Sequence, residues 1–559
     1  MNNKTDPAQQ RRVILAVVLS FLFFIVYSEF FIDKKIMSEQ NASLSQNASL
    51  SQNASVADSN ANLAVNSNAN SAPDLATNSK ATPLSNADTQ APITQSAYQH
   101  KALVSVSSEY FSAKIDELGR ISSFVLKDAK FKDEKGADLE LIENKDNKPL
   151  PLELRFSNTA INQKAFSTAY SVDLDTTNEI KVGKNAPLTL TLTQNLGELV
   201  VQKKLKFYEQ GNYEIEVNLS KDEPYFISAG SRPSVSVDNY TVHGALIVDT
   251  KDTVETFEDG DVEQNEQRTA FLLSSFDRYY AAFFYNFATP LNALITKDAK
   301  GDSVVYASAS NAFKAGGYIG AKEFDTLKAI DTRLERVIEY GWFTFIAKPA
   351  FAFLSWLFAY IGNWGWAIVV LTLIIRLILF PLTYKSMMSM NKLKDLAPKM
   401  TELREKYKGD PQKLNLHMME LYKKHGANPF AGCLPIILQI PIFFAIYRVL
   451  QNAVELKAAP WALWINDLSV MDPYFVLPIL MGATMFVQQL ITPMSIQDPT
   501  QAKIMKFLPV IFTFFFLWFP AGLTLYWCVN NICSLVQQLV INKMFAREHN
   551  KGQNNENRS

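Results

Sequence analysis

The sequence predicts a polytopic α-helical membrane protein that carries one large antiparallel β-sandwich domain outside the membrane. Three observations predict this fold class. Apolar, Phe-rich segments gather at the N-terminus and after Gly341, the region between them alternates as β-strands do, and basic residues concentrate in alternate loops. The 559-residue chain is long enough for several domains. Its balance of 54 Lys+Arg against 55 Asp+Glu argues against nucleic-acid binding.

Residues 1–32 contain the first expected span, TM1. It is an apolar stretch that starts at Val13, follows Arg11 and Arg12, and lacks an A-x-A-like cleavage site. We therefore expect an uncleaved signal anchor with its N-terminus in the cytoplasm. Residues 33–97 are rich in Ser, Asn, Ala and Gln without a sustained hydrophobic period, which predicts a disordered linker.

Residues 98–325 contain short runs in which apolar and polar residues alternate. The clearest runs are LVSVS, YFSAKID, ISSFVLKD, LELRFS, LTLTLTQ, LVVQKKLKFY, YEIEVNLS and SVSVDNYTVHG. Such strands, separated by Gly, Asn and Pro, predict an exported antiparallel β-sandwich. The region holds only His100 and His243 and no GxSxG or HExxH motif, so we expect no enzymatic activity and no cofactor or metal there.

Residues 326–360 are expected to hold a helix at the outer membrane surface. The part over 341–360 is a candidate seventh span, but Lys348 and Pro349 stand at its middle. Counting it would also place the most basic loop outside the cell. We therefore expect an amphipathic interfacial helix.

Residues 361–545 form the expected helical core. Its spans TM2 to TM6 cover residues 364–383, 429–450, 474–492, 504–519 and 522–544. We expect Pro435, Pro441 and Pro509 to kink or shorten their helices. TM5 would reach only about 24 Å, less than the hydrocarbon thickness of about 30 Å, so the bilayer is expected to thin beside it.

Loop charge agrees with six spans and with both termini in the cytoplasm. Residues 384–428 carry ten lysines and arginines, whereas Lys457 is the only one in the loop after TM3. Apolar residues at helical spacing on both sides of Gly409 predict a cytoplasmic helical hairpin in 384–428. Its charge suits either anionic lipid or the docking of a ribosome or targeting factor. Residues 546–559 are expected to form a cytoplasmic tail.

One charge, Arg376, lies inside the apolar run of TM2. A guanidinium at such depth is costly unless water or a partner solvates it. Because Arg376 is nearer to Lys385 than to Trp364, water is expected to reach it from the cytoplasm. The alternative is a structural arginine that extends to the interface. Thr372 lies one turn earlier on the same face.

Polar residues also recur on the other spans. They are Gln439 on TM3, Gln488 on TM4, and Trp527, Asn531, Ser534 and Gln538 at 4,3,4 spacing on TM6. Each alone can be a simple contact between helices. Together with Arg376 they predict a hydrophilic groove that opens to the cytoplasm.

Several segments resemble a known family. GNWGWAIVVLTLIIRLILFPLT, GCLPIILQIPIFFAIYRVL, APWALWINDLS, DPYFVLPILMGATMFVQQ and FPAGLTLYW are similar to the core of the YidC/Oxa/Alb family of membrane insertases, over about residues 341–545. The N-terminal anchor and the exported domain resemble the Gram-negative form of the family.

The resemblance implies an energy-independent insertase and chaperone of the bacterial inner membrane. Its partners would be nascent membrane proteins, lipids, and the Sec translocon with its accessory subunits. Arg376 would be the groove arginine, and Thr372 and Trp527 would contact the substrate. Relatives often have tyrosine at the last position, so Tyr526 is a candidate substitute. The resemblance further implies a mutarotase-like sandwich without catalytic function.

A small-solute transporter or channel is the alternative class of function. It would use the same polar cavity but would need a midplane site, usually between internal repeats. The sequence shows no such repeat.

Overall fold

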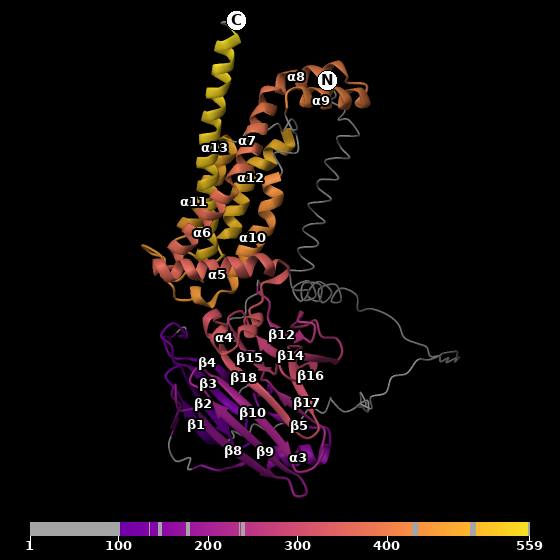
Figure 1. The fold of residues 1–559 in the computed structure, drawn as a ribbon, viewed down its shortest axis with the longest axis vertical. Helices are drawn as coiled ribbons and strands as arrows, with labels where there is room; N and C mark the ends of the chain where they lie inside the picture. The colour runs from indigo at the N-terminus through magenta and orange to yellow at the C-terminus, as the bar shows by residue number, and fades with distance from the viewer. Residues whose placement is uncertain are drawn as a thin grey trace, which may run out of the picture.

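The computed structural model describes residues 101–556 except 134, 144–147, 175–178, 234, 236–240, 427–433 and 492–498. The expected signal anchor and linker therefore lie outside the described residues. The β-strands form one end of the molecule, the long helices form the other, and helix α5 crosses between them (Figure 1).

The described strands form two sheets. The smaller sheet has the order β4-β3-β2-β1-β7 and contains β1 (Ala102–Ser107), β2 (Phe111–Asp116), β3 (Ile121–Leu126), β4 (Leu139–Glu143) and β7 (Ile180–Lys181). In the larger sheet the order is β5-β11-β17-β16-β14-β15-β18-β10-β9-β8-β6, and β12 pairs with β13 and β14. Pairing is antiparallel throughout except between β1 and β7.

The larger sheet includes the strands that the alternating pattern predicts and a second set that it does not. The first set is β5 (Leu154–Phe156), β8 (Leu188–Asn195), β9 (Val200–Phe207) and β10 (Asn212–Leu219). The short β6 (Ser171–Val172) was not predicted. The second set is β11 (Tyr225–Ser228), β12 (Gly244–Asp249), β13 (Val254–Glu258), β14 (Glu266–Phe276), β15 (Tyr280–Tyr285), β16 (Leu291–Lys297), β17 (Ser303–Ala309) and β18 (Phe313–Ala321).

Burial on both faces explains why period-two analysis missed much of the second set. On β12, Ala245 and Ile247 belong to the core between the two sheets, whereas Leu246 and Val248 belong to a second core on the other face. Successive side chains of strand β15 likewise alternate between the same two cores. When both faces are covered, a strand reads as a continuous apolar run without alternation.

One local expectation for the β-domain lies mostly outside the described residues, and one helix was not expected. In the run SVSVDNYTVHG, which was expected to be a strand, residues 234 and 236–240 are not described, and of the others only Gly244 is in a strand. Helix α3 (Thr159–Ser167) was not expected. Its start had a signal in the sequence, because the Asn158 side chain accepts hydrogen bonds from the backbone N–H groups of Ala160 and Ile161.

The chain leaves the β-domain through α4 (Phe324–Ile330) and the 3₁₀ helices η1 (Thr332–Val337) and η2 (Gly341–Phe343), and then enters α5 (Thr344–Ile361). Helix α5 lies across the ends of the other long helices (Figure 1). Its buried face includes Phe351 and Leu354, while Trp356 and Tyr360 are exposed. Lys348, near its start, pairs with Glu335 of η1 at 2.7 Å.

By length and composition, one helix among the described residues, Gly341–Ile361, could cross a membrane. The pair Trp364–Ile378 and Phe380–Asp395 passes the same test together, with a bend of 60° between them. Ile437–Asn452, Val476–Ile491 and Phe507–Phe516 are shorter apolar helices. This criterion does not reproduce the expected six spans, and the helix that passes alone is the one expected at the interface.

The span expected over 364–383 is not one continuous helix. Helix α6 (Trp364–Ile378) ends after Arg376, and the chain bends at Leu379 into α7 (Phe380–Asp395). Pro381 in the first turn of α7 provides the physical reason, because it has no N–H to donate to the carbonyl of Leu377 and its ring would clash with that carbonyl.

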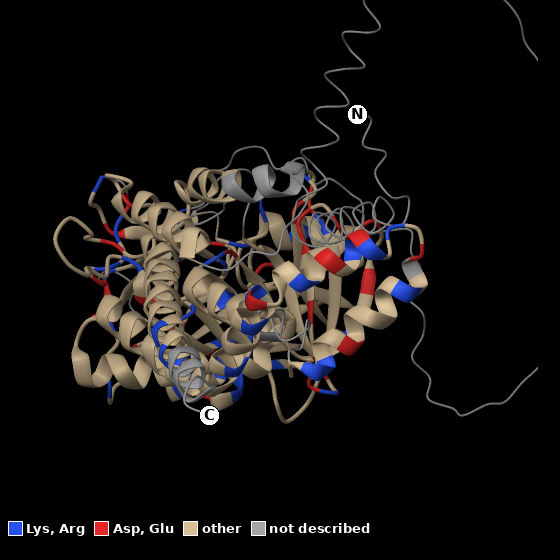
Figure 2. Ribbon diagram, turned by 90° about the horizontal axis from the view of Figure 1, so that it is seen from above, with Lys and Arg blue, Asp and Glu red and all other residues tan. Residues whose placement is uncertain are grey.

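Helices α8 (Ala397–Lys406) and α9 (Pro411–Lys424) form the expected hairpin. Leu396, Met400 and Met418 are the buried residues of its small core. Helix α7 ends at Asp395 and α8 begins at Ala397, so the helix breaks at Leu396, just before Pro398. Lysines and arginines stand on the hairpin and near the C-terminal end of the chain (Figure 2).

The remaining helices are α10 (Leu434–Asn452), α11 (Val476–Ile491), α12 (Pro499–Phe516) and α13 (Ala521–Glu556), with the short η3 (Val454–Leu456) after α10. Pro435 is the second described residue of α10, directly after residues 427–433, which lie outside the described residues, so the kink or shortening expected there stays a prediction. Helices α10 and α12 continue through Pro441 and Pro509. Helix α13 continues well beyond the expected end of TM6.

The β-domain packs directly on the end of α10. Leu450, Ala453 and Leu456 share an apolar core with Leu246 and Val248 of β12. The carboxyl of Glu455 lies in the same contact and accepts a hydrogen bond from the backbone N–H of Phe324 at 2.9 Å. Burial raises the pKa of Glu455 to about 7, and nearby Glu323 adds to this shift while Lys130 opposes it.

This raised pKa predicts a pH-dependent stability. The folded state favours the protonated carboxyl, so its contribution is fully present below about pH 4.5 and is lost as the pH rises through about 7. The urea concentration at the midpoint of unfolding of the full-length protein in detergent should therefore decrease as the pH is raised from about 5 to about 8. Glu455→Gln keeps the acceptor for Phe324 and should reduce this dependence. Glu335→Gln, which removes the partner of Lys348, serves as the control, and an unchanged slope in Glu455→Gln would refute the assignment.

Candidate functional site

The helical region buries a positive charge, Arg376, near the end of α6. Its side chain is 9% exposed. Its Nε donates to Oδ1 of Asn530 on α13 at 2.8 Å, and its Nη2 donates to the carbonyl oxygen of the same residue at 3.1 Å. Helix α13 therefore solvates the guanidinium with one amide side chain and one backbone carbonyl.

The guanidinium of Arg376 keeps unused hydrogen-bonding capacity. It has five N–H donors, and within the described part of the chain its Nη1 makes no hydrogen bond and no carboxylate pairs with it. A carboxylate is the acceptor that this group binds best, through two parallel hydrogen bonds. The arrangement can therefore hold an arriving acidic group without first breaking an ion pair.

The other polar residues near Arg376 extend this arrangement across three helices. Gln439 on α10 donates to the same Asn530 Oδ1 at 3.4 Å. The hydroxyl of Ser534 donates to the Asn530 carbonyl at 3.0 Å, and Gln537 Nε2 donates to the carbonyl of Arg376 at 3.3 Å. We call Arg376, Gln439, Asn530, Ser534 and Gln537 the polar seam.

The seam continues along α13 to a second amide group beside α7. Gln538 Nε2 donates to Oδ1 of Asn542 at 2.8 Å, and Asn391 Nδ2 donates to the same oxygen at 3.0 Å. Asn391 and Gln538 are both buried. These contacts hold α7 against α13 beyond the bend at Leu379.

The structure does not join the remaining predicted residues to Arg376 by hydrogen bonds. Thr372 is buried, but its hydroxyl donates to the Ile368 carbonyl of its own helix at 2.7 Å. The Nδ2 of Asn531 is buried without a partner among the described residues. Gln488 is half-buried on α11 and is not among the hydrogen-bond partners of Arg376.

The aromatic candidates occupy different surroundings. Trp527 lies between α10 and α12, edge-on to Phe443 at 4.5 Å between ring centroids and tilted against Phe516 at 5.4 Å. Its Nε1 is buried and, in the described part of the chain, unpartnered. Tyr526 is 2% exposed and belongs to the apolar core. Trp527 is thus the better placed of the two to contact an apolar segment between α10 and α12.

Sequence reasoning missed Asn530, Gln537, Asn391 and Asn542. Asn530 follows Trp527 by three residues and precedes Ser534 by four, so helical spacing places it on the polar face of α13. A polar face of α13 defined more widely than the 4,3,4 spacing would have included Asn530. Which side chain forms a hydrogen bond with Asn530 depends on how α13 is rotated against α6, and spacing alone does not determine this rotation.

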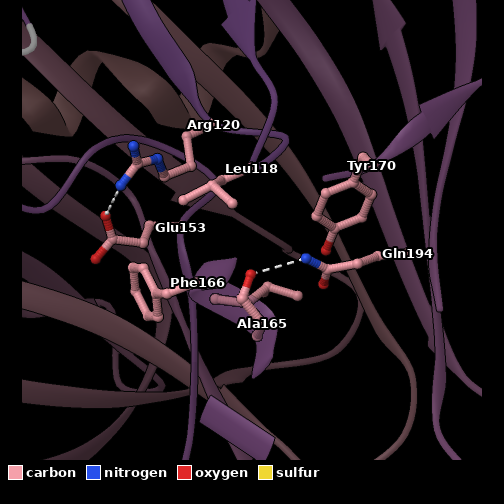
Figure 3. A pocket seen from close by; sticks show the side chains of 8 residues that line it. Leu118, Arg120, Glu153, Ala165, Phe166, Tyr170 and Gln194 are labelled. Carbon is pink, nitrogen blue, oxygen red and sulfur yellow. Dashed lines mark hydrogen bonds and ion pairs between the residues drawn. The ribbon is translucent and has the colours of Figure 1, made fainter. Parts of the chain in front are cut away.

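The β-domain contains a small pocket between α3 and the sheets. Arg120 and Glu153 on its wall pair with each other at 3.0 Å, while Gln194 donates to the Ala165 carbonyl and Tyr170 lies opposite (Figure 3). Its described lining residues include no His, Cys or Ser.

A sheet domain docks on apolar helices, and one of these helices buries Arg376, which pairs with no carboxylate in the described part of the chain. This arrangement is typical of a membrane protein with a large domain outside the bilayer. Two family models match the chain. One, described as "60Kd inner membrane protein", matches residues 356–549, and the other, "YidC periplasmic domain", matches residues 269–353.

Relatives match over nearly the full length. A protein named "Membrane protein insertase YidC" from Campylobacter jejuni subsp. jejuni is 60% identical over 553 residues, 99% of each chain. The proteins of that name from Wolinella succinogenes and Helicobacter pylori are 48% and 43% identical, and the matches cover 96% of this chain and 95% and 96% of theirs. The chain belongs to the YidC family of membrane protein insertases, which confirms the resemblance. It is a protein of the bacterial inner membrane with a periplasmic domain.

Proposed function

We propose that the chain inserts nascent membrane proteins into the inner membrane by receiving their polar tails at the polar seam. The observation that carries this proposal is Arg376, a buried guanidinium that pairs with no carboxylate in the described part of the chain. A tail with an acidic residue would exchange part of its hydration for hydrogen bonds to Arg376. This exchange lowers the cost of moving the tail into the bilayer.

The adjoining apolar segment of the client then enters lipid beside α10 and α12. Each buried CH₂ group contributes about 0.8 kcal/mol to this transfer. Exposed Phe507 and Phe514 of α12 lie along the proposed path, and Trp527 stands at its inner side. Partitioning of the client provides the driving force, so the process needs no catalysed reaction, in line with the expectation that the chain is not an enzyme.

The length of α6 supports a thin bilayer around the seam. Helix α6 has 15 residues before the 60° bend, so it rises about 22 Å, against about 30 Å for an average hydrocarbon core. A bilayer that thins to match this helix shortens the path of the polar tail. The groove that opens to the cytoplasm, with Thr372, Gln488, Asn531 and Gln538 along it, is part of this proposal.

Partners follow from the surfaces of the molecule. We propose that the basic hairpin α8–α9 and the C-terminal part of α13 meet the ribosome, a targeting factor or anionic lipid. The proposal that the chain works alone or beside the Sec translocon and its accessory subunits rests on the family resemblance. The alternative, a small-solute transporter, has no specific observation in its favour.

The test of the proposal is site-specific photocrosslinking from position 527 during synthesis of a single-span client. We expect crosslinks to the client while its tail is untranslocated and their loss after release. Ile479, an exposed residue on α11, provides the control position. Equal crosslinking from both positions at every chain length would contradict a defined path along Trp527.

The proposed six-span topology makes a separate prediction. Single cysteines at Lys394 and Lys424 should react with a membrane-impermeant maleimide only after permeabilisation, whereas one at Leu463 should react in intact cells. Leu463 is 86% exposed and lies in the loop between α10 and α11. The natural cysteines are replaced beforehand. Labelling of position 394 in intact cells would mean that residues 341–360 span the bilayer.

A further inference from the structure

The end of α10 next to the β-domain is held by polar contacts that the insertion mechanism above does not use. Arg278, in the turn between β14 and β15, donates from Nε to the carbonyl of Gln451 at 2.8 Å. Asn452 Nδ2 donates to the Glu339 carbonyl at 2.7 Å, and Lys457 Nζ donates to the Tyr280 hydroxyl at 2.9 Å. We call these three contacts the clasp.

Arg278 satisfies a requirement of the helix itself. The last four carbonyls of a helix lack partners within it, and the C-terminal end carries a partial negative charge. The carbonyl of Gln451 is one of these four, because α10 ends at Asn452. A guanidinium from the β-domain therefore provides both the hydrogen bond and the complementary charge.

The turn that carries Arg278 is held by hydrogen bonds and a ring contact. The buried carboxylate of Asp277 accepts hydrogen bonds from the backbone N–H groups of Tyr279 and Tyr280, at 2.9 and 2.7 Å. The guanidinium of Arg278 lies over the ring of Tyr279 at 4.5 Å. A fixed turn can transmit the position of the β-domain to α10.

The other part of the same helix touches the polar seam. Gln439 shares Oδ1 of Asn530 with Arg376, and Phe443 packs edge-on against Trp527. Gln439 precedes Gln451 by about 18 Å of helix. A shift of the helix at the clasp therefore changes the contacts of α10 with α13 at the seam.

We propose that Arg278 is a positioning residue for insertion. By capping α10 from the β-domain, it holds Gln439 and Phe443 against α13 and so sets the separation of the helices where Arg376 meets the client tail. This inference rests on the proposed function of the seam. It assigns the β-domain a mechanical role in place of a chemical one.

The test uses the full-length protein in lipid nanodiscs, with its natural cysteines replaced and spin labels at Ile437 on α10 and Val536 on α13. Both side chains are exposed. Arg278→Ala should broaden and lengthen the distance distribution between the labels and slow client insertion severalfold. Arg278→Lys should restore part of both effects. Arg268→Ala, which removes an exposed arginine of β14 that pairs with Glu266, should change neither.

An unchanged distance distribution in folded Arg278→Ala would overturn the proposal. If Arg278→Ala does not accumulate, Tyr280→Phe is the variant that tests the proposal. It removes only the hydroxyl that accepts from Lys457, so it should change the distance between the two labels in the same direction by a smaller amount. Arg376→Ala separates the two hypotheses. If it inserts clients normally while Arg278→Ala still shifts the distance and slows insertion, the seam model fails and the positioning role stands.

Discussion

Arg376→Ala is expected to slow the insertion of clients with acidic exported tails by about tenfold to a hundredfold. A hydrogen bond to a charged group contributes about 1.5–3 kcal/mol, and about 1.4 kcal/mol corresponds to tenfold in rate. The variant loses the guanidinium whose Nη1 makes no bond in the described part of the chain. The measurement is the insertion rate of one single-span client into proteoliposomes, with its tail residue either acidic or neutral.

Arg376→Lys should keep part of the activity. An ammonium retains the charge but lacks the planar fork that donates both to Asn530 and to an arriving carboxylate. The client with the neutral tail is the internal control, because its rate should depend little on either substitution. Equal rates for the parent and Arg376→Ala with every client, at equal protein abundance, would remove the basis of the seam model.

The second large effect is expected at Asn530, where stability and function should separate. Asn530→Leu leaves the buried Nε of Arg376 without its acceptor, which should cost about 1–3 kcal/mol of stability and lower the thermal midpoint. Asn530→Asp places a carboxylate at the same atom, 2.8 Å from Nε. It should hold α6 against α13 at least as firmly and yet impair insertion, because the charge of Arg376 is then neutralised within the protein.

Asn531→Leu is the matched control for stability alone, because Asn531 also belongs to the proposed groove. Its Nδ2 is buried without a partner among the described residues, so its removal should cost little stability. Thermal unfolding in detergent and the insertion assay are measured on the same preparations. An Asn530→Asp protein that is stable and inserts acidic-tailed clients at the parent rate would show that a free guanidinium is not required.

Much of the β-domain could be predicted because several strands have one covered and one exposed face. In β9 and β10 the inward positions alternate with exposed ones, so the pattern is visible in the residues. In β12 and β15 both faces are buried, one against the smaller sheet and one against the core that contains α4 and α5. No local pattern reports a second covering layer, because that layer comes from residues far along the chain.

For the candidate site, the sequence alone predicted Arg376 and, among the polar contacts on α13, Ser534 and Gln538, but not Asn530, Gln537 or Asn542. A charge inside an apolar run is unfavourable wherever the helix packs, and helical spacing defines a face without any partner. The sequence also determined that the chain joins a bundle of apolar helices to an alternating β-domain, since both patterns are local properties of the residues.

Only the tertiary structure decided which groups meet. Asn530, and not Asn531, accepts from Arg376, and the hydroxyl of Thr372 is used by its own helix. The contact between Arg278 and Gln451 joins parts of the chain that are 173 residues apart. The physical reason is that hydrogen bonds require distances near 3 Å, and the rotation and bending of packed helices, such as the 60° bend after α6, determine these distances.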